Sequence, residues 1–272
     1  MEKYRYVFVV LLYRNMEDII DLIHSIQNKL TSQAHVILVN SYYDESTLKQ
    51  ARNTAAEYGC SIINTENKGY GHGNNEGVKY ALDHFEFDYL IICNPDTTIR
   101  YFDTKALLKP EVPAIYAPKI VASTGKLQNP HWAFHSSILE YLQYVGDKHK
   151  WKVLDYFVIA VLKAARILTA KDADKRNRKQ VKVSSAHGSF VIVSAEATKK
   201  LYPFYDEHMF LFYEEVYLGN KAYLAKVPTY YVKDIVIDHK EDGSMRISNV
   251  NLRKESHKSV VYYYEHKGKG YK

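Results

Sequence analysis

Residues 89–97 read YLIICNPDT, an apolar run that stops abruptly at Asn94, Pro95 and Asp96. A continuous apolar run of this length is typical of a strand buried on both faces, as in a parallel sheet covered by helices. The strand ends at Pro95, because proline has no N–H to donate to a neighbouring strand. Asp96 therefore follows the carboxyl end of a central strand, where open α/β sheets bind their ligands. A carboxylate there suits Mg²⁺ or Mn²⁺ holding a phosphate, although the tripeptide taken alone is more typical of a turn.

The chain on both sides of this stretch alternates between apolar runs and amphipathic segments. Strands are predicted at Tyr6–Leu12, His35–Val39, Cys60–Ile63, Ala114–Pro118, Gly188–Val193 and Thr229–His239. Helices are predicted after a cap at Asn15, with Ile19, Leu22, Ile23, Ile26 and Leu30 on one face, and at Ser46–Tyr58, Asn74–Phe85, Glu196–Leu201 and Glu214–Ala225. This alternation predicts the α/β class, with a doubly wound, mostly parallel sheet and helices on both faces. Right-handed crossovers then gather the strand ends on one edge.

Composition narrows the class of protein. The 272 residues suffice for one large α/β domain or two small ones, and the net charge of +6 is too small to indicate nucleic acid. The 25 tyrosines suit sugar-binding clefts, membrane interfaces and cores alike. Cys60 and Cys93 form neither a metal motif nor a disulfide framework, which favours reduced cysteines in a cytosolic protein. The first residues, MEKYR, lead into an apolar run too short for a signal peptide or a transmembrane helix.

A glycine-rich segment, Asn67–Gly77, reads NKGYGHGNNEG between a predicted strand and a predicted helix. Glycines let the backbone approach a ligand closely, and free N–H groups at a helix start attract phosphate. The spacing matches neither the dinucleotide fingerprint nor a P-loop. The alternative is a loop whose glycines supply positive φ angles. The four glycines and three asparagines favour a binding site.

Residues 205–218 read YDEHMFLFYEEVYL and place Glu214 and Glu215 at the start of a predicted helix. Carboxylates at that position stabilise a helix through its macrodipole, which is sufficient reason for the pair. The functional alternative is that one of them is a general base, since apolar rings nearby raise the pKa of a carboxylate. A further candidate is His239, which ends an apolar strand. If that strand lies beside Asp96, His239 completes a metal or diphosphate site.

The order and spacing of these segments resemble the large inverting family of GT-A glycosyltransferases, in particular its rhamnosyltransferase-like branch. Four blocks carry the resemblance: Val7–Asn15, Asn67–Gly77, Asn94-Pro95-Asp96 in place of the Asp-x-Asp metal motif, and Gly188–Leu218. The sequence also departs from the family pattern. Arg14 is inserted in the first block, Asn40-Ser41 replaces the nucleotide-reading Asp-Asn, Glu214-Glu215 replaces Glu-Asp, and Tyr217 replaces an Asp.

The resemblance implies a GT-A (Rossmann-like) fold and a hexosyltransferase, moving rhamnose or another hexose from a dTDP- or UDP-linked donor to an acceptor hydroxyl with inversion. Mg²⁺ or Mn²⁺ is then held by Asp96 with His239, and Glu215 is the catalytic base. Asp206 and Glu214 position the acceptor or support the helix start. The implied donor-binding residues are Tyr13, Asn40, Asp44, Asn67, Gly69, Gly73, Asn74 and Asn94.

The tract from His131 to Lys182 is apolar, aromatic and basic, and two helices are predicted in residues 131–170. From Asp147 to Lys182 it has 11 Lys or Arg against 4 Asp or Glu. An apolar helix flanked by Trp132, Trp151 and basic residues suits an anionic membrane surface, and a core or homodimer interface is the equal alternative. The membrane reading predicts a peripheral enzyme at the inner face of the cell membrane that acts on a polyprenyl-linked saccharide in cell-surface polysaccharide synthesis.

The expected division of the chain follows these features. Residues 1–130 form the nucleotide-sugar half, 131–182 the helical basic segment, 183–245 the acceptor and catalytic half, and 246–272 a basic, Tyr-rich tail. Lys171–Lys182 is predicted to be a mobile linker.

Two other classes of protein remain open. A nucleotidyltransferase has a similar sheet, but the Gly-rich signature of its first strand is absent from Met1–Asn15. A nucleotide-sugar-binding scaffold that lost activity with the Asp replaced by Tyr217 is the main alternative.

Overall fold

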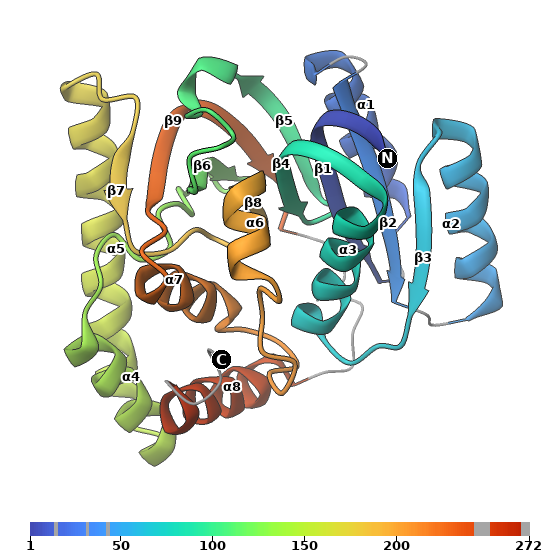
Figure 1. The fold of residues 1–272 in the computed structure, drawn as a ribbon. Helices are drawn as coiled ribbons and strands as arrows, with labels where there is room; N and C mark the ends of the chain where they lie inside the picture. The colour runs from blue at the N-terminus through green and yellow to red at the C-terminus, as the bar shows by residue number, and fades with distance from the viewer. Residues whose placement is uncertain (14–15, 31–32, 42–43, 242–250, 268–272) are drawn as a thin grey trace.

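The computed structural model describes residues 1–13, 16–30, 33–41, 44–241 and 251–267. Among these residues, a nine-stranded sheet with the order β3-β2-β1-β4-β8-β6-β9-β5 forms the centre, and β7 pairs with the first residues of β9 (Figure 1). The strands are β1 (Glu2–Leu12), β2 (Ala34–Ser41), β3 (Ser61–Thr65), β4 (Phe85–Cys93), β5 (Thr97–Phe102), β6 (Ile115–Ala122), β7 (Val181–Val183), β8 (Phe190–Ser194) and β9 (Thr229–His239).

Strand β1 shows that the sheet is covered on both faces. Tyr6 and Phe8 pack with α1 (Glu17–Leu30) and α2 (Glu45–Tyr58), whereas Val7 and Val9 pack with α3 (Tyr70–His84). Successive side chains of a strand point to opposite faces, so apolar residues at consecutive positions require helices on both sides. The predicted apolar face of α1 is buried. Asn15, the predicted cap of that helix, lies outside the described residues.

The first four strands of the core are parallel, as predicted. Strand β1 is parallel to β2 and β4, and β2 is parallel to β3. The second half is mixed, because β8 runs antiparallel between β4 and β6, and β5 runs antiparallel to β9. Since β6 and β9 are parallel to each other, only β5, β7 and β8 among the described strands oppose the common direction. The prediction of a mostly parallel α/β sheet is confirmed.

Two local predictions in this region were incomplete. Helix α3 begins at Tyr70, so most of the segment expected to be a loop is helical. Strand β5, directly after Asp96, was not predicted, because its short sequence TTIRYF becomes a strand by pairing with β9 far along the chain. That pairing, from Thr97↔His239 to Phe102↔Ile235, brings the two ends of the site together.

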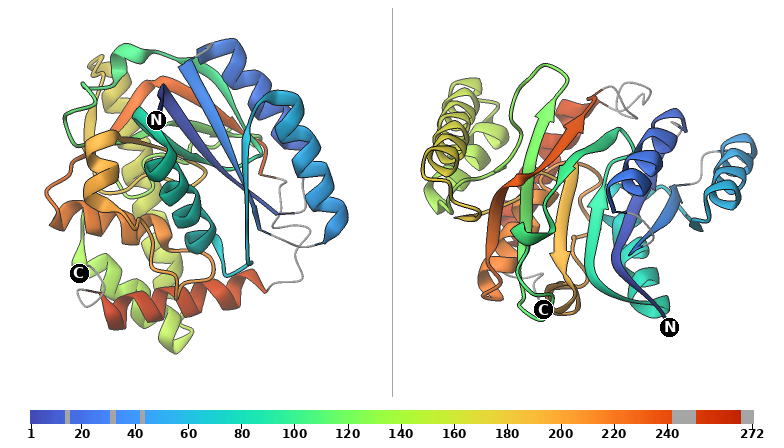
Figure 2. Two further views of the ribbon diagram at one scale, coloured as in Figure 1. Left: turned by 45° about the vertical axis from the view of Figure 1, so that its right-hand side comes forward. Right: turned by 90° about the horizontal axis from the view of Figure 1, so that it is seen from above.

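The rest of the chain is mainly helical, and its longest helix lies along the β9 side of the sheet (Figure 2). The helices are α4 (Ser137–His149), α5 (Lys152–Lys175), α6 (Ala195–Leu201), α7 (Glu214–Leu224) and α8 (Leu252–His266), with a 3₁₀ turn at Thr104–Ala106. The prediction of two helices after residue 131 is confirmed, but the predicted linker is wrong. Residues 171–175 complete α5, and 181–183 form β7.

The expected C-terminal tail contains a helix, α8. Its Val260 and Tyr263 are buried in a cluster with Trp132, Tyr213 and Tyr217, and α8 also lies along α4. The sequence obscured this helix because its buried side chains are tyrosines and a valine set among Lys, Arg and His. None of the described helices is both long and apolar enough to cross a membrane.

Candidate active site

Asp96 and His239 meet beyond the carboxyl end of β4, as the sequence allowed. Asp96 precedes β5, His239 is the last residue of β9, and the pairing of these strands sets them side by side. Asp96 Oδ1 lies 3.3 Å from His239 Nε2, and both residues are buried. The backbone N–H of Lys240 donates to Asp96 O at 3.0 Å, which holds the two segments together.

The other ring nitrogen of His239 determines what lies between these two residues. Nδ1 is 2.7 Å from Gln128 Oε1, and Gln128 Nε2 donates to Glu241 Oε1 at 2.7 Å. Glu241 orients the amide of Gln128, so the carbonyl oxygen faces the ring and Nδ1 is the donor. In the neutral ring, Nε2 then presents a lone pair to the carboxylate of Asp96. Two acceptors at this distance need a proton or a cation between them.

The chemistry of this pair therefore fits a divalent cation. An oxygen and an imidazole nitrogen are suitable ligands for Mn²⁺, and Gln128 orients the histidine as outer-shell partners of metal ligands do. Within the ranges the structure describes, no group of three or more His, Cys, Asp or Glu side chains is arranged to hold a metal ion. Two protein ligands are enough where a substrate diphosphate and water supply the rest.

Glu214 and Glu215 begin α7 after an unusual turn. Phe212 and Tyr213 both have left-handed φ angles, of 72° and 75°. Such conformations are costly for residues other than glycine and concentrate at functional sites. Glu215 is half-buried, and its Oε1 accepts a hydrogen bond from the N–H of Gly188 at 3.2 Å. A Cβ at Gly188 would lie 3.1 Å from that oxygen, so the glycine makes room for the carboxylate.

Two histidines that sequence reasoning missed connect Glu215 to His239. The ring centroids of His131 and His187 are 5.9 Å apart, and those of His187 and His239 are 6.0 Å apart. Burial lowers the pKa of His131, and it lowers the pKa of His187 to about 3, each partly opposed by the charge of Glu215. His131 and His187 lie in two separate loops and His239 ends β9, so no spacing in the sequence marks them as a group.

The two carboxyl groups of α7 have opposite pKa shifts. Burial, and then the charge of Glu215, raises the pKa of Glu214 well above its ordinary value. Glu214 Oε1 is buried and has no hydrogen-bond partner among the described residues. Burial also acts to raise the pKa of Glu215, but His131, His187 and the Gly188 N–H outweigh it, and the pKa of Glu215 is lowered. The two environments therefore make Glu215 the more readily ionised carboxyl group and Glu214 the more readily protonated one.

A shallow hollow beside β3 includes one of the expected donor-binding residues, Asn67. Its lining is Leu48, Asn64, Thr65, Glu66 and Asn67. Asn40, at the end of β2, is buried and donates through Nδ2 to Asn64 Oδ1 at 3.0 Å. Asp44 caps α2, its Oδ1 accepting from the Thr47 N–H at 2.7 Å, and Tyr13 follows the end of β1.

The glycines of α3 are explained by packing. A Cβ at Gly69, which has φ +110°, would lie 2.3 Å from Phe210 O, and a Cβ at Gly73 would lie 2.4 Å from Leu11 Cδ1. Close approach to the Phe210 backbone is sufficient to require glycine at Gly69, whereas at Gly73 the neighbour is the end of a flexible side chain. Asn74 is fully buried and donates to Tyr70 O at 2.9 Å. Asn94 is half-buried beside Asp96, and its backbone N–H donates to Ser189 O at 2.9 Å.

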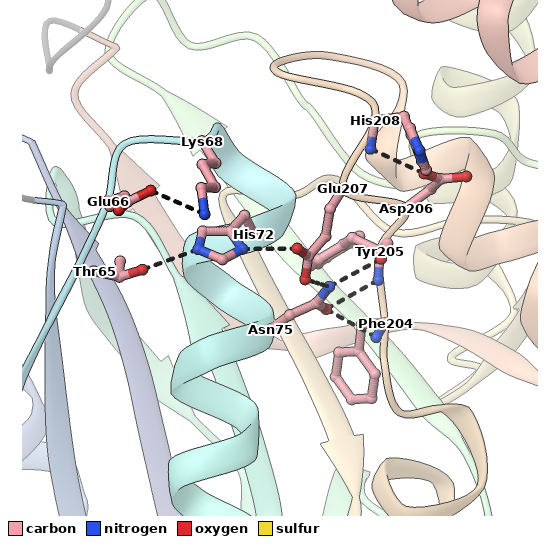
Figure 3. Close-up of polar contacts among 10 residues, drawn as sticks. All are labelled: Thr65, Glu66, Lys68, His72, Asn75, Phe204, Tyr205, Asp206, Glu207 and His208. Atoms are coloured by element: carbon pink, nitrogen blue, oxygen red, sulfur yellow. Dashed lines mark hydrogen bonds and ion pairs between the residues drawn. The ribbon is translucent and has the colours of Figure 1, made fainter.

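Asp206 lies in a loop that is attached to α3, as Figure 3 shows. Asn75 Oδ1 accepts from the N–H groups of Phe204 and Tyr205, and His72 Nδ1 lies 2.7 Å from Glu207 Oε2. Asp206 itself is hydrogen-bonded to His208, at 2.8 Å between Oδ1 and Nδ1. Asn75 and His72 were not singled out in the sequence beyond their place in the glycine-rich segment.

Tyr217, which replaces an acidic residue of the family pattern, is buried against α8. It is 6% exposed, and its ring centroid lies 6.4 Å from that of Tyr263. The apolar position that α8 creates explains the loss of the charge.

Comparison with known proteins supports the fold. The chain is 23% identical over 222 residues to the low-salt glycan biosynthesis hexosyltransferase Agl10 of Haloferax volcanii, which covers 79% of this chain and 60% of Agl10. No family model matches the chain.

Two solved structures are similar in three dimensions. The first is GalNAc-T7 with UDP, GalNAc and Mn²⁺, at a TM-score of 0.59 and 11% identity, covering 87% of this chain and 44% of that protein. The second is TarS of S. aureus, at 0.55 and 13%, covering 97% of this chain and 44% of TarS. The chain thus has the GT-A fold of nucleotide-sugar-dependent glycosyltransferases. It spans less than two thirds of the length of each of these three proteins.

Proposed function

We propose that this protein is a glycosyltransferase that moves a hexose from a nucleoside-diphosphate donor to an acceptor hydroxyl. The observation that carries the proposal is the line of side chains from Asp96 through His239 and His187 to Glu215, which joins a cation-compatible pair to an ionised carboxylate. The line lies beyond the strand ends, where α/β sheets bind ligands. The likeness to the hexosyltransferase Agl10 supports the same reaction.

Asp96 and His239 are the residues that would hold Mg²⁺ or Mn²⁺. The bound cation would neutralise the charge that develops on the leaving diphosphate. The described GalNAc-T7 structure, which contains Mn²⁺ and UDP, is consistent with this use of the fold. On the protein side, Gln128 keeps Nε2 of His239 directed at Asp96, and Asn94 borders the diphosphate or ribose.

Glu215 is the proposed catalytic base. Its carboxylate takes the proton of the acceptor hydroxyl while that oxygen forms the new bond to the sugar C1 and the bond from C1 to the diphosphate breaks. Attack from the face opposite the leaving group inverts the configuration. Glu214 supports the start of α7 in its protonated form, and Asp206 stands on the acceptor side with its loop attached to α3.

The donor nucleotide is proposed to occupy the hollow beside β3. Asn40, Asn64 and Asn67 offer amide groups that can hydrogen-bond a pyrimidine edge. Tyr13 and Asp44 are proposed to border the base and ribose. The segment containing Gly69, Gly73 and Asn74 is proposed to support the adjoining wall, with Gly73 and Asn74 buried behind it. We propose UDP- or dTDP-linked hexoses, including rhamnose as in the family branch that the sequence resembles.

The acceptor is proposed to be a lipid-linked saccharide of cell-surface polysaccharide synthesis. The basic and apolar character of α5 supports this choice, and we propose a peripheral position on the inner face of the cell membrane. Pairing of two copies through the same helix is the alternative use of that surface.

Replacing Glu215 with Gln tests the proposal. Glu215→Gln removes the proton acceptor while keeping the shape of the side chain, so we expect transfer to fall by about 10²–10⁴-fold. Donor binding should remain, since Glu215 contacts the acceptor side. Glu215→Asp, which has the carboxylate usual in the family, should retain part of the activity. The measurement is product formation with a panel of UDP- and dTDP-sugars.

The matched control is Glu196→Gln, which changes an exposed glutamate at the first turn of α6. It should leave the transfer rate unchanged. Transfer at the wild-type rate by Glu215→Gln would show that the base has been wrongly assigned.

A further inference from the structure

The outward face of α5 is apolar, although nothing in the described part of the chain covers it. Five large apolar side chains are exposed there: Val153, Tyr156, Phe157, Ile167 and Leu168. Val153 is 80% exposed and Leu168 is 66% exposed. Such exposure is common for lysine side chains but unusual for large apolar side chains grouped on one face. Helical spacing puts 153, 157, 160, 164, 167, 168 and 171 on one side, and all of these except Lys171 are apolar. From 153 to 168 this stripe is about 24 Å long.

Basic residues stand at both ends of the stripe. Lys150 and Lys152 are exposed at its start, and Lys171 and Lys175 are exposed at its end. The four acidic residues of the same tract offset this charge only in part. Asp172 pairs with Arg176 and Arg178, and Asp147 contacts His257. Asp155 Oδ1 is buried, so Asp174 is the fully exposed carboxylate among the four. The surface around the stripe is therefore positively charged.

The opposite face of α5 is part of the protein core and contacts the candidate active site. Val158 is buried in the cluster with Tyr213 and Tyr217. Arg166 donates from Nε to Pro130 O at 2.9 Å, and Nη1 donates to Leu127 O at 3.1 Å. This guanidinium thereby holds the loop that carries His131, since Nη2 also donates to His131 O, and one helix joins the exposed stripe to the site.

We propose that the outward face of α5 docks on an anionic bilayer surface, with the helix lying parallel to the membrane. The apolar stripe enters the boundary between head groups and acyl chains, and the flanking lysines contact lipid phosphates. Exposed Trp151 sits at the level where tryptophan collects in membrane proteins. Positive charge at both ends favours this occupant over a second copy of the chain, because like charges would meet in a symmetric pair.

On this surface a lipid-linked acceptor would reach the active site from the membrane. Only that statement about the acceptor rests on the proposed function.

The test is flotation of the full chain with vesicles of phosphatidylcholine alone or mixed with phosphatidylglycerol, at low and high salt. We expect flotation with the anionic vesicles at low salt and loss of binding at high salt. Phe157→Ser/Leu168→Ser should weaken binding about tenfold or more. Tyr101→Ser/Val112→Ser removes two similarly exposed side chains elsewhere and should bind as wild type.

Tryptophan fluorescence gives a second readout, because Trp132 is buried and Trp151 is 58% exposed. Insertion should shift the emission to shorter wavelength with anionic vesicles only, and less so in Phe157→Ser/Leu168→Ser. Absence of vesicle binding at low salt would overturn the proposal, as would equal binding by both double variants. A dimer in solution that Phe157→Ser/Leu168→Ser dissociates, without vesicle binding, would assign the face to self-association. Stabilisation by a nucleoside diphosphate, measured on the same samples, separates failure of the membrane surface from failure of the proposed function.

Discussion

At the scale of single residues, hydrogen bonds outside the site determine what its side chains can do. Gln128 is hydrogen-bonded to His239 and Glu241, and it thereby sets which nitrogen of His239 faces Asp96. Glu214 and Glu215 are neighbours of the same type with opposed pKa shifts. The candidate residues were recognisable in the sequence, but these partners were not.

Gln128→Leu should weaken metal-dependent binding of the nucleotide. Without the Oε1 acceptor, His239 can turn or change tautomer, and loss of such a partner typically lowers metal affinity about 10–100-fold. The measurement is the Mn²⁺ concentration needed to stabilise the protein in the presence of a nucleoside diphosphate. Gln180→Leu is the matched control, since Gln180 is bonded to Ala106 O away from the site. An unchanged Mn²⁺ dependence would contradict the role of Gln128.

Glu214→Gln should make the folded protein more stable at high pH. The pKa of Glu214 is raised in the fold, so between its ordinary and its raised value the folded state binds more protons than the unfolded state. Stability from this group is therefore lost as pH rises through that window. The variant should therefore be more stable than wild type above the ordinary pKa of glutamate, and its stability should decline less steeply as pH rises. Urea unfolding at a series of pH values measures the free energy of unfolding of both proteins, and Glu57→Gln, at an exposed glutamate, is the control. If stability declined with pH in Glu214→Gln as it does in wild type, the raised pKa of Glu214 would be refuted.

At the scale of elements, α3 is defined by how closely it packs on the sheet. Its glycines were interpreted as ligand-binding positions, because a Gly-rich segment after a strand is typical of phosphate sites. The structure adds another reason for them, since at Gly77 a Cβ would lie 2.3 Å from Val9 Cγ1 and 2.8 Å from Val39 Cγ2. Such neighbours belong to strands β1 and β2 and cannot be read from local sequence.

Gly77→Ala should destabilise the protein by about 1–3 kcal/mol, despite the gain of about 1 kcal/mol in helix propensity. The two valines are branched at Cβ and buried, so they cannot rotate away. Gly73→Ala should cost less, because its nearest neighbour is Cδ1 at the end of the Leu11 side chain. Urea midpoints of both variants provide the measurement. Greater stability of Gly77→Ala than wild type would show that the sheet can relax at this position.

At the scale of the whole molecule, the candidate site combines residues from two parts of the sheet, the parallel strands β1–β4 and the mixed strands that follow them. The hollow beside β3 belongs to the parallel half, and Glu215 belongs to a helix after the antiparallel strand β8. Pairing of β5 with β9 and the attachment of residues 204–207 to α3 connect the halves. An inactive scaffold could retain this architecture, so binding of the donor must be tested separately from transfer.

Nucleoside diphosphates provide that test. A nucleotide at a hundredfold its Kd stabilises the fold by about 2.7 kcal/mol, which corresponds to a rise in Tm of about 5–10 °C. We expect UDP or dTDP to give this shift with Mn²⁺ and a much smaller one with EDTA, as recorded by thermal denaturation. GDP is the control for base selectivity. Stabilisation together with undetectable transfer supports the scaffold, and indifference to all three nucleotides would contradict a donor site.

By itself the sequence determines the class of fold and the main candidates for chemistry. Apolar runs such as residues 89–93 specify strands buried on both faces, and the polar residues that follow them, including Asp96, must lie at the ligand-binding edge. These inferences hold because the hydrophobic pattern of a strand and the residues that end it lie within one short stretch of the sequence. Only the tertiary structure decides that His131 and His187 lie between Glu215 and His239, that β5 is a strand, and that the tail contains α8. Each of those features depends on contacts between segments that are distant in the sequence. The free energy of such contacts cannot be inferred from a local sequence pattern.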